Sequence, residues 1–99
     1  MQASDLKNNF SNLTSEEFER KFNELVRENS HFRNLDEKNR KVILEILKKY
    51  RDRIKSGIGI HYDDIQREMY KLYEDRVKLN FSDLDLKSAK EILEVFKKA

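Results

Sequence analysis

The sequence predicts an all-α protein, an antiparallel up-down four-helix bundle that forms a single domain over residues 1–99. The chain has no proline and only two glycines, a composition that favours long uninterrupted helices. Its apolar residues recur every three or four positions, although 40% of all residues are charged. Helix-capping residues precede these apolar stripes, and the short connections between the stripes favour antiparallel neighbours.

The first predicted helix begins after Thr14, whose hydroxyl can cap the amide of Glu17. We expect this helix to fray near Asn29 and Ser30. Upstream of it, residues 1–13 form either a short helical leader or a loose segment. The predicted buried face consists of Phe18, Phe22, Leu25 and Val26.

The second helix is predicted over residues 35–56, beginning near Asn34 or Asp36. Gly57 follows its last apolar turn and is predicted to be a left-handed C-cap. Gly59 then lets the backbone bend, so that Ile58 or Ile60 can return to the core. The apolar arc of this helix is broad and comprises Val42, Ile43, Ile46, Leu47, Tyr50 and Ile54.

The third helix is predicted to begin around residues 61–63, and we expect Tyr62 and Tyr70 to lie half-buried at the edges of its apolar face. Ser82 is the predicted cap of the fourth helix, where Phe81 can pack on Leu86. The predicted buried residues are Ile65, Met69, Leu72, Tyr73 and Val77 in the third helix and Ala89, Ile92, Leu93 and Phe96 in the fourth.

Composition excludes several classes of function. The chain has no cysteine, which rules out disulfides, thiolate catalysis and Cys-ligated zinc. Neither a signal peptide nor a membrane span is visible, so we expect a cytoplasmic location. The formal net charge of +2 gives little support to nucleic-acid binding.

No metal, cofactor or catalytic residue is predicted. His61, Asp64 and Glu68 share one helix face, but zinc commonly requires a further His or Cys ligand. Capping and solvation explain these three residues without a metal. The two histidines are isolated from each other in the sequence, and a solid bundle offers no concave site for acid–base work. We therefore expect a protein that is not an enzyme and has no small-molecule substrate.

A basic arc on the second helix is the predicted partner-binding site. It lies opposite the apolar arc, and Leu44 lies in its middle, so that an apolar anchor is surrounded by cations. The alternative is that Leu44 is a single exposed leucine on a solvated face, or is covered by the N-terminal segment. The predicted partner-binding residues are Leu44, Lys41, Lys48, Arg51 and Lys55.

Part of the chain resembles a known family. The resemblance lies in the stretch "VILEILKKYRDRIKSGIGI" and in the following "YDDIQREMYKLYEDRVKLNFSDLDLKSAKEILEVF". These stretches are similar to small bacteriocin immunity proteins of the enterocin A type. Separately, "LKNNFSNLTSEEFERKFNELVREN" looks like the first helix of colicin-type immunity proteins. The enterocin-type resemblance implies a four-helix bundle without a catalytic site. It also implies a cytoplasmic protein, expected here to be a monomer, that confers resistance by binding a toxin's target complex at the membrane.

Two other functions remain open from the sequence. One is a small nucleic-acid-binding regulator of the helix-turn-helix kind, and the other is a phage or plasmid inhibitor of a host protein. The first would use the fourth helix for reading, but the lysines there are offset by acids that repel phosphate. These acids are Asp83, Asp85, Glu91 and Glu94.

Overall fold

The computed structural model describes residues 14–97, which form helices joined by short connections and one isolated bridge between Ile60 and Lys97. The predicted all-α class is therefore confirmed. The predicted leader over residues 1–13 lies outside the described residues. The elements are α2 (Ser15–Glu28), the 3-10 helix η2 (Ser30–Phe32), α3 (Glu37–Lys49), α4 (Arg51–Lys55), α5 (Tyr62–Glu74), α6 (Arg76–Leu79) and α7 (Asp83–Val95).

Three of the long helices begin at capping residues that the sequence predicts. The Thr14 hydroxyl accepts a hydrogen bond from the Glu17 amide at 3.2 Å, and Asp36 caps α3. At the start of α7 the Ser82 amide donates to the Asp85 carboxylate at 2.9 Å, while the Asp85 amide donates to the Ser82 hydroxyl at 3.1 Å. This reciprocal capping box satisfies two amides that the first turn of the helix leaves unpaired.

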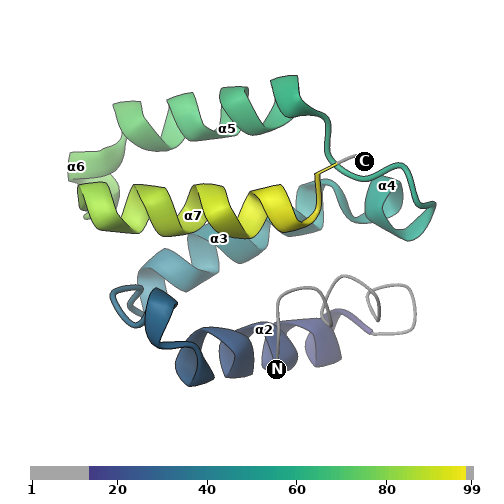
Figure 1. Cartoon of the computed structure of the whole chain (residues 1–99), viewed down its shortest axis with the longest axis horizontal. Helices are drawn as coiled ribbons and strands as arrows, with labels where there is room; N and C mark the ends of the chain where they lie inside the picture. Colours follow the sequence, from purple (N-terminus) through teal and green to yellow (C-terminus); the bar gives the residue numbers. More distant parts are fainter. Residues whose placement is uncertain (1–13, 98–99) are drawn as a thin grey trace.

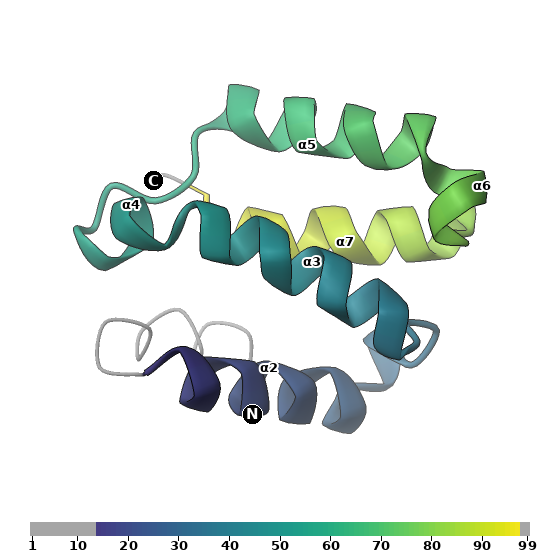
Figure 2. The same cartoon turned by 180° about the vertical axis from the view of Figure 1, so that it is seen from behind.

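The four long helices among the described residues are α2, α3, α5 and α7, and the chain reverses direction from each to the next (Figure 1). α5 packs along α7, α7 packs against α3, and α3 packs against α2. Viewed from behind, α3 lies between α5 and α2 (Figure 2). The short α4 and the loop after it connect α3 to α5 at one end of the molecule.

The apolar stripes of the first and fourth predicted helices form much of the core, as expected. The rings of Phe18 on α2 and Phe96 after α7 meet edge to face, with centroids 6.4 Å apart. The buried stripe residues are Phe18, Phe22, Leu25, Val26, Ala89, Ile92, Leu93 and Phe96.

Within residues 14–97 no helix is long and apolar enough to cross a bilayer.

The second and third predicted helices are each divided in two. The helix predicted over residues 35–56 is α3 followed by α4, and it is interrupted at Tyr50 (φ −103°, ψ 13°). The helix predicted to continue to Val77 is α5 followed by α6, with the interruption at Asp75 (φ −96°, ψ 10°). Neither interruption is at a glycine or proline, so the sequence contains no helix-breaking signal at these positions.

The buried side of α5 differs from the prediction at Tyr73 and Val77. Tyr73 is 52% exposed and Val77 is 86% exposed. The charged residues Asp64 and Glu68 occupy two of the inward positions of α5. A count of apolar residues alone leaves these two positions out and therefore assigns Tyr73 to the buried side. Val77 follows the interruption at Asp75, where the periodicity of α5 no longer applies. The buried residues of α5 are Asp64, Ile65, Glu68 and Leu72.

The turn after α4 begins at Gly57, which adopts the predicted left-handed conformation (φ +85°). The Gly57 amide donates to the Ile54 carbonyl at 3.1 Å, and the Ile58 amide donates to the Arg53 carbonyl at 3.0 Å. These two bonds form a Schellman motif, the helix ending in which a left-handed glycine follows the last turn.

The chain then turns inward at Gly59, which also has a positive φ (+78°). Ile60 is buried in the core, whereas Ile58 is exposed. The Ile60 amide donates to the Phe96 carbonyl at 2.8 Å, so the start of α5 is joined to the end of α7. Of the two isoleucines that the sequence offers for the core, Ile60 is the one used.

Replacing Gly57 with alanine is expected to lower the free energy of unfolding by about 1 kcal/mol, because an L side chain is strained at positive φ. The space around the added Cβ is open, so the strain comes from the backbone and not from a clash. Gly57→Asn should lose less, because asparagine tolerates the left-handed region. Urea denaturation measures both losses, and equal losses would contradict this explanation.

Candidate functional site

The predicted anchor Leu44 is not exposed. It is 3% exposed and belongs to the hydrophobic core, because α2 packs on this face of α3. One turn before Leu44, Arg40 donates from Nε to the Asn23 side-chain oxygen at 3.1 Å. One turn after it, Lys48 Nζ lies 3.8 Å from a Glu19 carboxylate oxygen. The expectation of an exposed apolar anchor at Leu44 is therefore wrong. The alternative that the N-terminal segment covers Leu44 concerns residues 1–13, which lie outside the described residues.

The predicted cations around Leu44 do not form one open face. Lys41 is exposed, whereas Arg51 and Lys48 are half-buried and Lys48 faces α2. The Lys55 side chain lies outside what the structure describes. A role for these cations in partner binding stays a prediction, but the buried Leu44 cannot take part in it.

His61, Asp64 and Glu68 do not lie free in solvent. His61 is exposed at the start of α5, whereas Asp64 and Glu68 are buried and paired with cations. Asp64 accepts hydrogen bonds from Arg53 Nη1 at 2.6 Å and from Arg67. The expectation that solvation explains Asp64 and Glu68 is therefore wrong. In the part of the chain that the structure describes, no three His, Asp or Glu side chains are grouped to hold a metal ion.

Glu68 lies at the centre of a second buried group. Its Oε2 accepts hydrogen bonds from Lys49 Nζ and from the Tyr50 hydroxyl, each at 2.8 Å. Burial alone would raise the pKa of Glu68 above 4.5, but these bonds and the Lys49 charge outweigh it and the pKa is lowered. Likewise burial opposes ionisation of Asp64, and Arg53 with Arg67 lowers its pKa below 3.8. Both carboxylates are structural ion-pair partners that fix α5 to α3 and α4.

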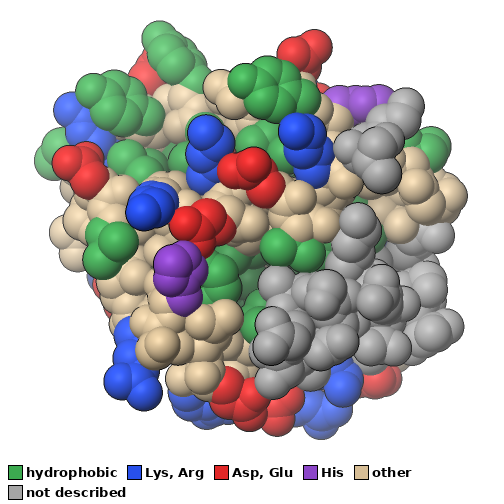
Figure 3. Space-filling view, in the orientation of Figure 1, with side chains coloured by type: hydrophobic (Ala, Val, Ile, Leu, Met, Phe, Trp, Pro, Cys, Tyr) green, Lys and Arg blue, Asp and Glu red, His purple; other side chains and the backbone are tan. Residues whose placement is uncertain are grey.

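Four exposed large hydrophobic residues lie on the described α5 and α6, and we name them the tyrosine face: Tyr62, Tyr70, Tyr73 and Val77. Tyr62 is 57% exposed and Tyr70 is 65% exposed, so both lie further out than the half-buried positions predicted for them. Tyr62, Tyr70 and Tyr73 follow one another at helical spacing on α5, and Val77 lies on α6 beyond the interruption at Asp75. Hydrophobic side chains gather along the upper edge of the molecule in Figure 3, where α5 lies in the same orientation in Figure 1.

Cations lie over two rings of the tyrosine face. The Arg76 guanidinium lies 4.1 Å from the Tyr73 ring centroid and also donates to the Tyr73 carbonyl at 2.7 Å. The Lys97 ammonium lies 5.2 Å from the Tyr62 centroid. A hydrogen bond to Glu74 and the charge of the Glu74 carboxylate raise the pKa of Tyr70. The face thus presents flat apolar rings together with hydroxyl and guanidinium donors.

A hollow of about 600 Å³ lies within the tyrosine face, between α5 and α7. Tyr70 and Tyr73 line it together with the partly buried Met69 and Leu86. Arg67, whose guanidinium is paired with Asp64, also lines this hollow. Aromatic residues, methionine and arginine are the types enriched in protein–protein interfaces, and a shallow hollow between them can accept an apolar side chain of a partner.

The sequence contained part of the signal for this face. Tyr62 and Tyr70 are recognisable as tyrosines near the edge of an apolar stripe, where contact residues are common. The apolar pattern predicts a core position for Tyr73, because a count of apolar residues does not include the charged Glu68 among the inward residues. When Glu68 is included among the buried residues, the predicted buried side of α5 shifts around the helix and Tyr73 falls on the exposed side.

Comparison with protein-family models, with curated proteins and with solved structures found no match to this chain.

Proposed function

We propose that this protein is a non-catalytic interaction protein that binds a partner protein through the tyrosine face, and that it protects its cell as bacteriocin immunity proteins do. The observation that carries the binding proposal is the exposure of Tyr70 and Tyr73 beside a hollow lined by Met69 and Leu86. Exposed apolar residues that are grouped in this way mark interaction sites on folded proteins.

The composition of the face favours protein over nucleic acid as the partner. Tyrosine and arginine dominate the energetics of protein interfaces because their rings and planar groups bury large areas at low entropic cost. Nucleic-acid binding instead requires an uninterrupted positive surface. Glu74 and Asp75 adjoin Tyr73, and their charges disfavour an approaching phosphate backbone.

The immunity assignment, and the antiparallel up-down four-helix bundle that goes with it, rest on different support. The reversal of chain direction between successive long helices is compatible with that bundle (Figure 1). The stretch from the second to the fourth predicted helix supplies the sequence resemblance. A cytoplasmic location and a monomeric state belong to the same proposal.

Replacing Tyr70 with alanine is expected to weaken protection or partner binding about 30-fold, the effect of losing an interface anchor worth about 2 kcal/mol. The melting temperature should stay unchanged, because this side chain is 65% exposed. The measurement is the concentration of a bacteriocin of the enterocin A type that stops growth of sensitive cells expressing each variant, with melting followed by circular dichroism.

Tyr70→Phe is the matched control, because it keeps the ring and removes only the hydroxyl. It should protect nearly as well as the unchanged protein. Full protection by the alanine variant would exclude Tyr70 as an anchor. If the unchanged protein protects against none of the enterocin A-type bacteriocins, the immunity assignment is wrong.

A further inference from the structure

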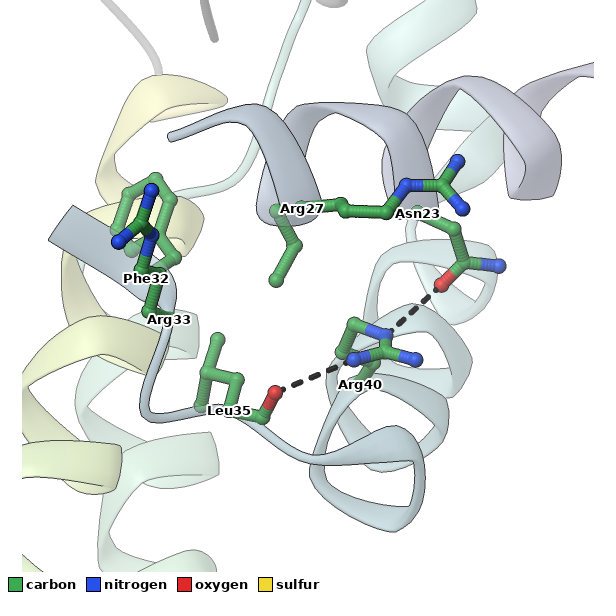
Figure 4. Close-up of a pocket in the computed structure, with 7 residues that line it drawn as sticks. Asn23, Arg27, Phe32, Arg33, Leu35 and Arg40 are labelled. Carbon is green, nitrogen blue, oxygen red and sulfur yellow. Dashed lines mark hydrogen bonds between the residues drawn. The ribbon is translucent and has the colours of Figure 1, made fainter. Parts of the chain in front are cut away.

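A second hollow, distinct from the tyrosine face, opens between α2, η2 and α3 (Figure 4). Its volume is about 220 Å³, enough for one side chain but not for a helix. We name it the arginine hollow, since arginines surround an apolar floor. The described lining consists of three arginines, which we call the rim (Arg27, Arg33 and Arg40), three buried apolar residues, which we call the floor (Val26, Phe32 and Leu35), and Asn23.

Arg40 is held in place by neutral groups. Its Nε donates to the Asn23 side-chain oxygen at 3.1 Å, and its Nη1 donates to the Leu35 carbonyl at 3.2 Å (Figure 4). None of the ion pairs between described residues includes Arg40. The guanidinium is therefore oriented in advance, partly buried, and without a described carboxylate to balance its charge.

The other two rim arginines come from separate elements. Arg33 lies with Phe32 on one side of the hollow, and Arg27 lies with Arg40 and Asn23 on the other (Figure 4). Both Arg27 and Arg33 are exposed, and neither belongs to an ion pair between described residues. Their long side chains are free to move onto a ligand that enters between them.

Arginines elsewhere in the molecule are used differently. Arg53 and Arg67 both bind the Asp64 carboxylate and so have a countercharge. In contrast, none of the described residues that line the arginine hollow is acidic. Three cations around a small concave site whose described lining has no acid create a positive potential that an anion can neutralise.

The floor restricts which anion fits. Val26, Phe32 and Leu35 are buried core residues whose edges line the hollow. Inorganic phosphate would satisfy the arginines but leave this apolar floor in contact with water. A ligand that carries a carboxylate and an apolar group on the same carbon satisfies both parts at once.

We propose that the arginine hollow binds the free C-terminal carboxylate of a partner polypeptide whose last residue is apolar. The carboxylate would pair with Arg40 and with the flanking arginines, and the apolar side chain of the same residue would cover the floor. Arg40 supplies the fixed donor, since its planar group matches a carboxylate in two-point geometry. The proposal does not depend on the tyrosine face.

The test is a titration of the ¹⁵N-labelled full chain with N-acetyl-Gly-Gly-Leu carrying a free C-terminus, followed by NMR. We expect saturable shifts of the Arg40 Nε–Hε resonance and of the backbone amides around the hollow. The same peptide with an amidated C-terminus should bind at least about tenfold more weakly, because the charge-assisted hydrogen bonds are lost.

Arg33→Gln is the variant of choice, because Arg33 is exposed, whereas Arg40 also joins α2 to the segment before α3. It should weaken peptide binding several-fold. Arg20→Gln changes the same charge at an exposed position on α2 outside the hollow and should leave binding unchanged.

Three results would overturn the proposal. One is equal binding of the acid and amide peptides, since the carboxylate would then be irrelevant. Another is displacement of the peptide by an equal concentration of inorganic phosphate or acetate, which would mean a general anion site. The third is the absence of saturable shifts up to about 10 mM peptide, a concentration that detects even millimolar affinity.

Discussion

Replacing Leu44 with alanine is expected to lower the free energy of unfolding by about 3 kcal/mol, within the range measured for buried leucines. The loss combines the transfer of the removed methyl groups with the cavity left between α3 and α2. Arg40 and Lys48, one turn to either side, are tied to α2 and prevent the helices from closing fully over the gap. Urea denaturation at neutral pH gives the difference.

Leu84→Ala is the matched control for Leu44, because it makes the same chemical change at a side chain that is 55% exposed on α7. Its effect should remain below about 0.5 kcal/mol. If Leu44→Ala instead leaves stability unchanged and weakens partner binding, Leu44 is the exposed anchor that the sequence suggested and the packing of α2 on α3 described above is incorrect.

Replacing Glu68 with alanine is expected to lower the free energy of unfolding by about 3 kcal/mol, from a cavity and from unpaired polar groups. The buried Tyr50 hydroxyl loses its acceptor, which is the costlier part because water cannot replace it. Lys49 is about half exposed and loses less, since water can solvate it. Glu45→Ala, which removes an exposed carboxylate from α3, should change stability little.

Glu68 also makes the free energy of unfolding depend on pH. The folded pKa of Glu68 lies below its ordinary value of 4.5, and that of Asp64 lies below 3.8. A carboxyl group with a lowered folded pKa contributes its full stabilisation above the unfolded pKa and loses it as pH falls through the folded value. Stability should therefore decline from about pH 4.5 downward, and less steeply in Glu68→Ala. Parallel pH profiles for the two proteins would show that Glu68 does not contribute.

Much of the helical structure could be predicted because its signals are local. Thr14, Asp36 and Ser82 cap the helices at which the sequence places them, and Gly57 ends α4 in the expected conformation. Caps and left-handed glycines depend on the residues within one or two turns, so they are readable without knowledge of the fold.

Which side of a helix is covered depends on distant residues, and here prediction was weaker. Leu44 is flanked by cations, and nothing in its own helix reveals that Asn23 and Glu19 on α2 would bind them. On α5 the inward position of Glu68 is possible only because Lys49 and Tyr50 lie opposite it. Buried charges are rare unless paired, so a count of apolar residues passes over them.

The two candidate sites differ in how visible they are from sequence. Three of the four residues of the tyrosine face lie on the single helix α5, so an apolar periodicity that includes the buried Glu68 would locate them. The arginine hollow collects Arg27, Arg33 and Arg40 from three successive elements around a bend. Its concavity arises from the angle between α2 and α3, which local periodicity does not determine.

The hydrogen bond from the Ile60 amide to the Phe96 carbonyl closes a ring of chain that contains α5, α6 and α7. Closing a long flexible ring costs conformational entropy, but here α5 already packs along α7, so the ends are brought together by a preassembled hairpin. Segments linked in this way tend to open and close as one cooperative unit. Phe96 also contacts Phe18 on α2. Detachment of the chain end at Phe96 would therefore break the hydrogen bond to Ile60 and the contact with α2 at the same time.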